Sequence, residues 1–221
     1  MRVSSGHRRL VRSVAGAAVA AVAAVVAAAC APRAGPLLGV PTTRRLPNTA
    51  LPPGHRRLVF RWEYRERVFS ARGEGVARIA PPDSVRLDFF LENGATGGCV
   101  ALIGDSLTVP AQNEVRRYLP PVPMLWAALG RITIVGPDTT VRVDGDTLRA
   151  EIGRDPIWRM AFGSDSPVRV ERIAGGRIEE SVERTDSTRV VYRQPGAGRS
   201  LVLTVLRRFA ETRFDAAIWR C

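Results

Sequence analysis

The clearest pattern along the chain is an alternation of apolar and polar residues. In residues 60–68, FRWEYRERV, Phe60, Trp62 and Tyr64 fall on one side of an extended strand, and arginine and glutamate fall on the other. Similar short runs recur at 75–80, 84–91, 99–103, 106–109, 139–143, 147–152, 156–162, 167–173, 177–184, 188–193 and 199–208. Glycine, proline and aspartate separate them, as is typical of turns. The pattern predicts a mainly β domain of about ten antiparallel strands, a barrel or a sandwich.

One segment breaks this alternation. Residues 124–129, MLWAAL, follow Pro123 and are stopped by Gly130, which predicts a short helix. The segment is apolar all round, so we expect it to be buried. In a β-rich shell, the concave side of the sheet is where it would lie.

The N-terminus has the pattern of an export signal. Arg2, Arg8 and Arg9 precede the uncharged run of residues 13–29, which is alanine-rich and ends in small residues just before Cys30. The run is shorter than the ~20 residues that a membrane span needs, which disfavours a retained signal anchor. Residues 1–29 are therefore expected to be a signal peptide.

Cys30 is the expected lipid anchor. Residues 27–30, AAAC, resemble a bacterial lipobox, in which the cysteine is diacylated and becomes the new N-terminus. Cleavage at the A-x-A-like residues 27–29, leaving Cys30 free, is the alternative. Residues 30–57 are Pro-rich and predict a tether after the anchor, followed by a single domain over 58–221. Ala31 follows the cysteine in place of aspartate, which by lipoprotein-sorting rules implies the periplasmic face of the outer membrane.

Two further cysteines, Cys99 and Cys221, remain after lipidation of Cys30. An exported chain with an even remainder can close a disulfide, which would tie the last residue to a mid-chain strand. The alternative is a buried, unpaired Cys99 and a frayed C-terminus.

The charge suggests membrane lipid more than nucleic acid as a partner. The formal net charge is +12, and apart from two histidines every basic residue is an arginine. A positive chain is attracted to anionic head groups. The arginines are scattered among acidic residues without a basic run, so no nucleic-acid partner is expected.

Residues 104–107, GDSL, spell the nucleophile signature of a family of esterases. A serine nucleophile needs a base, and the only histidines are His7, in the signal, and His55, in the tether. Residues 145–148, GDTL, repeat the motif in the same setting between two predicted strands. Both are interpreted as β-hairpin turns, and Ser106 is not expected to be a nucleophile.

No other catalytic pattern is present. The chain lacks C-x-x-C, H-E-x-x-H and a Walker loop, and Gly73-Glu74-Gly75 lacks the third glycine and the helix of a dinucleotide loop. No enzyme activity, cofactor or metal is expected.

The segments described so far resemble the LolA/LolB-like superfamily of lipoprotein-localisation factors. The resemblance lies in residues 73–90, 100–110, 119–130 and 141–151, and extends over nearly all of 58–221. It implies an incomplete, half β-barrel whose concave face is covered by the short helix, enclosing a hydrophobic cavity for the acyl chains of lipids or lipoproteins. The protruding loop with an exposed apolar residue that LolB uses for membrane insertion has no counterpart that we can locate here.

The apolar face offers candidates for the lining of such a cavity. They are Phe60, Trp62, Tyr64, Phe89, Leu125, Trp126, Trp158 and Phe162. Trp126 is also a candidate for a movable lid, because prolines and Gly130 delimit its segment. For each residue the alternative is ordinary core packing. For the whole protein, the alternative to a carrier is a structural lipoprotein that serves as an accessory subunit of an envelope assembly.

Overall fold

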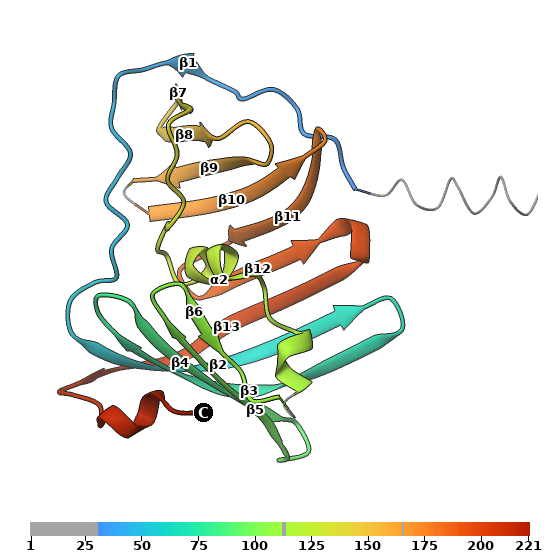
Figure 1. Cartoon of the computed structure of the whole chain (residues 1–221), viewed down its shortest axis with the longest axis vertical. Coiled ribbons are helices and arrows are strands. Elements are labelled where there is room, and N and C mark those ends of the chain that lie inside the picture. Colours follow the sequence, from blue (N-terminus) through green and yellow to red (C-terminus); the bar gives the residue numbers. More distant parts are fainter. Residues whose placement is uncertain (1–30, 112–113, 165) are drawn as a thin grey trace, which may run out of the picture.

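The computed structural model describes residues 31–111, 114–164 and 166–221. They form one antiparallel sheet of thirteen strands in the order β1-β7-β8-β9-β10-β11-β12-β13-β2-β3-β4-β5-β6. The sheet curls to one side, and its edge strands β1 and β6 do not pair with each other (Figure 1). The prediction of a mainly β half-barrel is confirmed, with more strands than expected.

The elements follow in chain order. The strands are β1 (Val40–Pro41), β2 (His55–Glu66), β3 (Phe69–Ala80), β4 (Ser84–Leu91), β5 (Thr96–Ile103), β6 (Ser106–Thr108), β7 (Thr139–Asp144), β8 (Thr147–Ile152), β9 (Ile157–Gly163), β10 (Ser166–Ala174), β11 (Arg177–Arg184), β12 (Arg189–Gln194) and β13 (Arg199–Glu211). The helices in the described part of the chain are α2 (Val122–Ala128) and three short 3-10 helices, η1 (Glu114–Arg117), η2 (Pro195–Ala197) and η3 (Ala216–Trp219).

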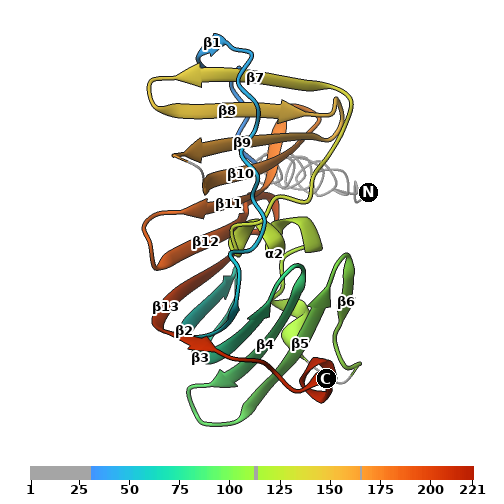
Figure 2. The same cartoon turned by 90° about the vertical axis from the view of Figure 1, so that its left-hand side faces the viewer.

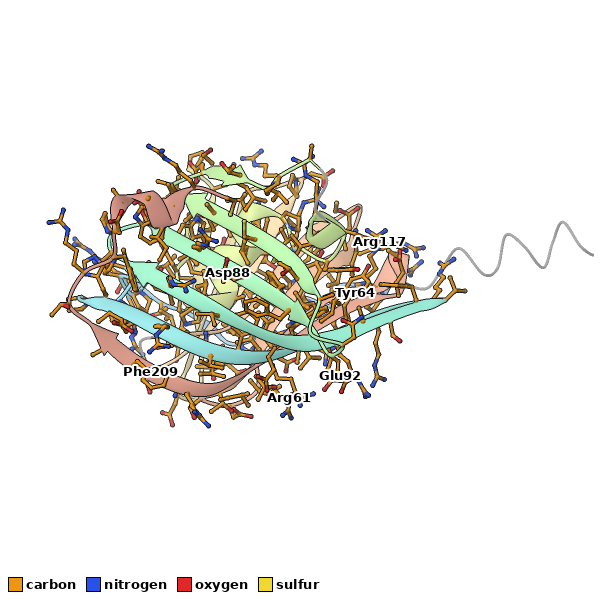
Figure 3. The ribbon with its side chains drawn as sticks, turned by 90° about the horizontal axis from the view of Figure 1, so that it is seen from below. Arg61, Tyr64, Asp88, Glu92, Arg117 and Phe209 are labelled. Carbon is orange, nitrogen blue, oxygen red and sulfur yellow. The ribbon has the colours of Figure 1, made fainter. Side chains whose placement is uncertain are left out.

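The alternation seen in the sequence gives the sheet two different faces. On β2, Phe60, Trp62 and Tyr64 are buried in the core on the concave side. Arg61, between them, is exposed on the outer side, and Figure 3 shows it pointing away from the sheet while Tyr64 lies on the inner side. Burial of the aromatic face is the main favourable term that holds this part of the fold together.

Two glycines of β3 make room for the aromatic residues of β2. Gly75 pairs with Phe60 and Gly73 pairs with Trp62. A Cβ on Gly75 would overlap the Phe60 ring, and a Cβ on Gly73 would overlap the carbonyl oxygen of Phe90. That same oxygen accepts a hydrogen bond of 3.2 Å from Trp62 Nε1. The glycines of GEG therefore serve close packing within a strand.

Helix α2 covers the concave face, as predicted, and contacts β10, β11 and β12 (Figure 1). Its residues Met124 to Ala128 are all buried. Trp126 is its anchor: the side chain is fully buried, and Nε1 donates a hydrogen bond of 2.8 Å to the carbonyl oxygen of Gly104. The Arg131 guanidinium lies over the same indole, 4.6 Å from the ring centroid. Trp126 is thus part of the packed core.

Residues 31–54, which form most of the predicted tether of residues 30–57, lie against the sheet. Two hydrogen bonds join this segment to the β10–β11 hairpin. The Pro32 carbonyl oxygen accepts from Ile178 N at 2.9 Å, and Ala34 N donates to the carbonyl oxygen of Gly176 at 3.0 Å. β1 pairs with β7, and the chain then crosses to β2 (Figure 2). In this crossing, Leu51 is buried and Thr49 Oγ1 accepts from Ile132 N at 2.8 Å. We call residues 42–54 the strap. The strap has few apolar residues and contains prolines, so its sequence shows no periodic pattern. The edge of β7 nevertheless supplies backbone hydrogen-bond partners for β1, just before the strap.

The packing of Trp126 yields a stability prediction. We expect Trp126→Ala to lower the free energy of unfolding by about 3–5 kcal/mol, because it opens a cavity and removes an indole–carbonyl hydrogen bond. Urea denaturation followed by far-UV circular dichroism measures the change. Val68→Ala, at an almost fully exposed position, is the control and should leave the midpoint unchanged. A loss below about 1 kcal/mol for Trp126→Ala would show that this residue is not the anchor.

Candidate functional site

A cavity of about 370 Å³ lies on the concave side of the sheet, bounded by helix α2 and the strap. This volume is at the lower end of the ~300–1,000 Å³ that is usual for small-molecule sites. Its lining consists of Asn48, Thr49, Ala50 and Pro52 of the strap, Leu125, Ala128, Leu129 and Gly130 at the helix, and, from the sheet and its turns, Arg56, Leu58, Phe60, Ala77, Ile79, Leu87, Ser166, Arg184, Ser187, Thr188, Val190, Leu203, Val205 and Arg208.

Most of this wall is aliphatic or aromatic. Phe60 and Ile79 are buried within the core, whereas Leu58 and Leu203 are only partly covered by neighbouring side chains. Apolar surface that other residues leave uncovered is the part of the wall on which a hydrocarbon chain gains free energy by burial.

Three arginines stand in this apolar wall. Arg56, Arg184 and Arg208 all line the cavity, and in the described residues none forms an ion pair with a carboxylate. Burial, and secondarily the charge of Arg208, lowers the pKa of Arg56 and also that of Arg184. The cavity is therefore apolar with a cluster of positive charge.

Each arginine reaches the cavity for a local reason. Arg56 follows the alternation of β2, two residues before Leu58 on the same face. On β13 a register shift between Val205 and Arg207 inserts one extra residue, so that Arg208 pairs with Leu58. This bulge moves Arg208 to the concave face, where strict alternation would have placed Arg207.

The third arginine also touches the helix. Arg184, at the end of β11, donates from Nη2 to the carbonyl oxygen of Ala128 at 3.0 Å. A cation beside the last carbonyls of a helix is favourable. Arg184 thus connects the cavity wall to its cover.

The predicted lining residues divide into two groups. Phe60 and Leu125 line the cavity. The others are placed in the core: Trp62, Tyr64, Phe89, Trp126 and Phe162 are buried, and Trp158 is half-buried against them. The sequence reasoning missed the three arginines and the strap. Extending the β2 alternation four residues back from Phe60, through Leu58, would have found Arg56.

A larger hollow of about 1150 Å³ lies at the β2–β3 hairpin, but its walls carry many charged side chains. Glu66 there accepts hydrogen bonds from Arg117 at 2.8 Å and from Arg199 at 2.8 Å. These bonds lower the pKa of Glu66 to about 2. The carboxylates of this hollow are thus paired with arginines, Glu66 as described, Glu63 with Arg65 and Glu92 with Arg72. This pairing distinguishes the hollow from the cavity under α2.

The GDSL segment is a two-residue turn between β5 and β6. Ile103 pairs with Ser106 across it, and Gly104 has the positive φ of 55° that such a turn requires. The only histidine among the described residues, His55, lies on β2, four strands away, edge-on to Phe214. The interpretation of this segment as a hairpin turn is confirmed.

The described residues also show no metal centre and no membrane helix. No three or more His, Cys, Asp or Glu side chains within them are grouped so that they could hold a metal ion. No helix in this part of the chain has the length and apolar character needed to cross a membrane.

Neither a family model nor a curated protein matches the chain. Several solved structures have a similar fold, among them the following three. A structure described as an outer membrane lipoprotein-sorting protein domain from Vibrio parahaemolyticus has 9% identity and a TM-score of 0.48, over 76% of this chain and 89% of that one. A DUF1329 family protein from Desulfovibrio piger has 10% identity and a TM-score of 0.49, over 78% and 91%. A LolA superfamily protein from Nitrosomonas europaea has 11% identity and a TM-score of 0.46, over 77% and 92%. One of the three thus belongs to the superfamily that the sequence resembles, and these likenesses concern the fold alone.

Cys30 lies outside the described residues, whereas Cys99 and Cys221 are both described and no disulfide joins them. Arg86 of β4 holds the C-terminal segment by donating from Nη1 to the carbonyl oxygens of Ile218 at 2.7 Å and Arg220 at 2.8 Å. In this position the Cys221 thiol lies within hydrogen-bonding reach of the Cys99 side chain. Burial, and next the contact with Cys99, raises the pKa of Cys221 to about 12.

This placement keeps the predicted disulfide testable. We expect mild oxidation to join Cys99 to Cys221, with a mass lower by two hydrogen atoms, and to raise the free energy of unfolding by about 2–4 kcal/mol. Intact mass and urea denaturation, with and without a reductant, measure both effects. Cys221→Ser is the control that abolishes them. Two free thiols persisting after oxidation would contradict the bond.

Proposed function

We propose that this protein is a non-enzymatic lipoprotein of the bacterial cell envelope that binds acyl chains of lipids or lipoproteins. The observation that carries the proposal is the apolar cavity between helix α2 and the concave face of the sheet. A carrier with such a site would serve the transport or insertion of lipoproteins at the outer membrane.

The free energy gained by burying an acyl chain in this cavity suits reversible binding. Each buried methylene contributes ~0.8 kcal/mol, so about ten of them contribute roughly 8 kcal/mol, which before the entropic cost of binding corresponds to a micromolar Kd. The partly covered side chains of Leu58 and Leu203 provide the surface for this contact.

A non-enzymatic role is supported by the surroundings of Ser106. The residue is exposed, at the end of a hairpin turn, and the described residues place no histidine beside it. Without a base to take its proton, a serine hydroxyl is a poor nucleophile.

Attachment through Cys30 would hold the domain at the membrane surface. Pro32, only two residues further on, already bonds to Ile178 of the β10–β11 hairpin. Two residues span at most about 7 Å, so lipid on Cys30 would keep this hairpin beside the head groups. The periplasmic face of the outer membrane is the proposed location.

A fractionation experiment tests the anchor. We expect the full-length protein expressed in a Gram-negative host to sediment with outer membranes, and Cys30→Ser to lose diacylglycerol attachment, measured by mass spectrometry of the membrane fraction. Ala31→Ser, one residue further along, is the matched control and should retain the lipid. A soluble wild-type protein cleaved before Cys30 would instead indicate ordinary signal-peptidase processing.

The binding site is tested by native mass spectrometry. The mature chain from position 30, carrying Cys30→Ser and exported with a cleavable signal, should show adducts of fatty-acid or phospholipid mass. Leu203→Trp should remove them, because the larger side chain occupies the cavity. Val202→Trp is the matched control: it is the adjacent residue of β13, faces the outer side of the sheet, and should retain the adducts.

A bare protein that takes up nothing from lipid vesicles or from an acylated peptide would contradict the carrier. That result would favour the alternative, an accessory subunit of an envelope assembly that needs a protein partner. Equal loss of adducts in both tryptophan variants would place the ligand outside the cavity.

A further inference from the structure

We propose that the cavity selects amphiphiles with an anionic oxyacid head, a carboxylate or a phosphate, which binds to Arg56, Arg184 and Arg208 while the acyl chain lies along the apolar wall. The inference rests on the proposed function, since it names the ligand class of the same cavity.

The first support is the contrast between these arginines and those on the outer face. On the outer face, Arg86 binds Asp88 at 2.7 Å and Arg159 binds Glu151 at 2.6 Å. The three cavity arginines have no such partner among the described residues. Burial lowers the pKa of Arg184, and the charge of the Asp186 carboxylate offsets part of this shift. The Oδ1 of Asp186, however, already accepts hydrogen bonds from the backbone amides of Thr188 at 2.7 Å and Arg189 at 2.9 Å.

The second support is that donors remain unused. A guanidinium has five N–H donors. Arg184 donates to Ala128, and Arg208 donates from Nη2 to the carbonyl oxygen of Ser187. The Nε of Arg56 is buried without a hydrogen-bond partner in the described structure. A buried donor left unsatisfied is unfavourable for the folded protein, and an acceptor on a ligand would satisfy it.

The third support is the arrangement of charge and apolar surface along one strand. Arg56, Leu58 and Phe60 follow one another on the concave face of β2 and all line the cavity. At ~3.3 Å per residue, they extend over roughly 13 Å. Arg208 is exposed, whereas Arg56 and Arg184 are partly buried, so the cluster runs from the solvent inward. This order matches a molecule with a charged head and a hydrocarbon chain.

Electrostatics favours the same ligand. Burial and the charge of Arg208 both disfavour the charged forms of Arg56 and Arg184 and lower their pKa. An anion among them offsets the repulsion and supplies charge-assisted hydrogen bonds. A neutral hydrocarbon chain would bury the three arginines further without giving them a hydrogen-bond acceptor. An inorganic anion would bind the arginines but leave the apolar wall in contact with water.

The experiment compares three ligands of one chain length. Isothermal titration of the mature Cys30→Ser chain with dodecanoate, dodecyl phosphate and dodecanol, all below their aggregation limits, gives the Kd of each. We expect both anions to bind about tenfold to hundredfold more tightly than the alcohol, as hydrogen bonds to a charged group imply. Inorganic phosphate at millimolar concentration should not displace dodecanoate.

The arginine variants locate the selectivity. Arg56→Gln, and separately Arg208→Gln, should reduce the preference for the anions to less than threefold, mainly by weakening the binding of the anions. Arg61→Gln is the matched control: it removes the same charge from the outer face of β2 and should keep the preference. Thermal unfolding of the ligand-free protein adds a second readout. The midpoint of Arg56→Gln should equal or exceed that of the wild type, because an unpaired, partly buried charge is removed.

The outcomes separate the two proposals. If none of the three ligands binds, the acyl-chain carrier itself is wrong. If dodecanol binds as tightly as the anions, or Arg61→Gln abolishes the preference as fully as Arg56→Gln does, the carrier stands and the anionic head site is wrong. Displacement of dodecanoate by inorganic phosphate would show a free-anion site instead.

Discussion

The structure depends on how an open sheet covers its own apolar face. A closed barrel fills its interior from all sides, but this sheet ends at β1 and β6 without joining them. Its concave side must therefore be covered by something else, and the helix that does so has only seven residues. The indole of Trp126, bonded to the Gly104 carbonyl and stacked under Arg131, fixes that helix in place. The turn that resembles an esterase motif thus has a structural role, because it supplies the acceptor.

A cover this short cannot fill the whole concave side. Helix α2 packs over β10 to β12, and Tyr118, just after η1, stacks on Trp62 and Phe69 toward the β2–β3 end. The strap leads into the start of β2, at the other end of that strand from Tyr118, and Leu51 is its buried side chain. The cavity is the space that remains between helix α2, the strap and the sheet. Its wall is apolar because the strands beneath it continue the alternation that builds the core.

The sequence predicts the parts of this fold that follow from local periodicity. Alternation placed Phe60, Trp62 and Tyr64 on one face, and the repeated Gly-Asp pairs marked two hairpin turns. It could not predict the position of Arg208, because the bulge on β13 depends on pairing with β2 and reverses the alternation. Nor could it separate cavity residues from core residues. Trp126 and Phe60 are both apolar and buried, and only the three-dimensional packing shows which of them borders empty space.

The different surroundings of the arginines on the two faces of the sheet connect the fold to the proposed ligand. Apart from His55, every basic side chain in the sheet is an arginine, and on the outer face cross-strand carboxylates satisfy many of them, as Glu151 of β8 does for Arg159 of β9. Within the described ranges the concave face offers Arg56 and Arg184 no such neighbour, and apolar side chains of similar size would pack there with less loss of hydration. An unpaired charge in an apolar wall weakens folding and strengthens the binding of an anion. The unpaired arginines that destabilise the empty cavity would therefore make it selective for anionic ligands.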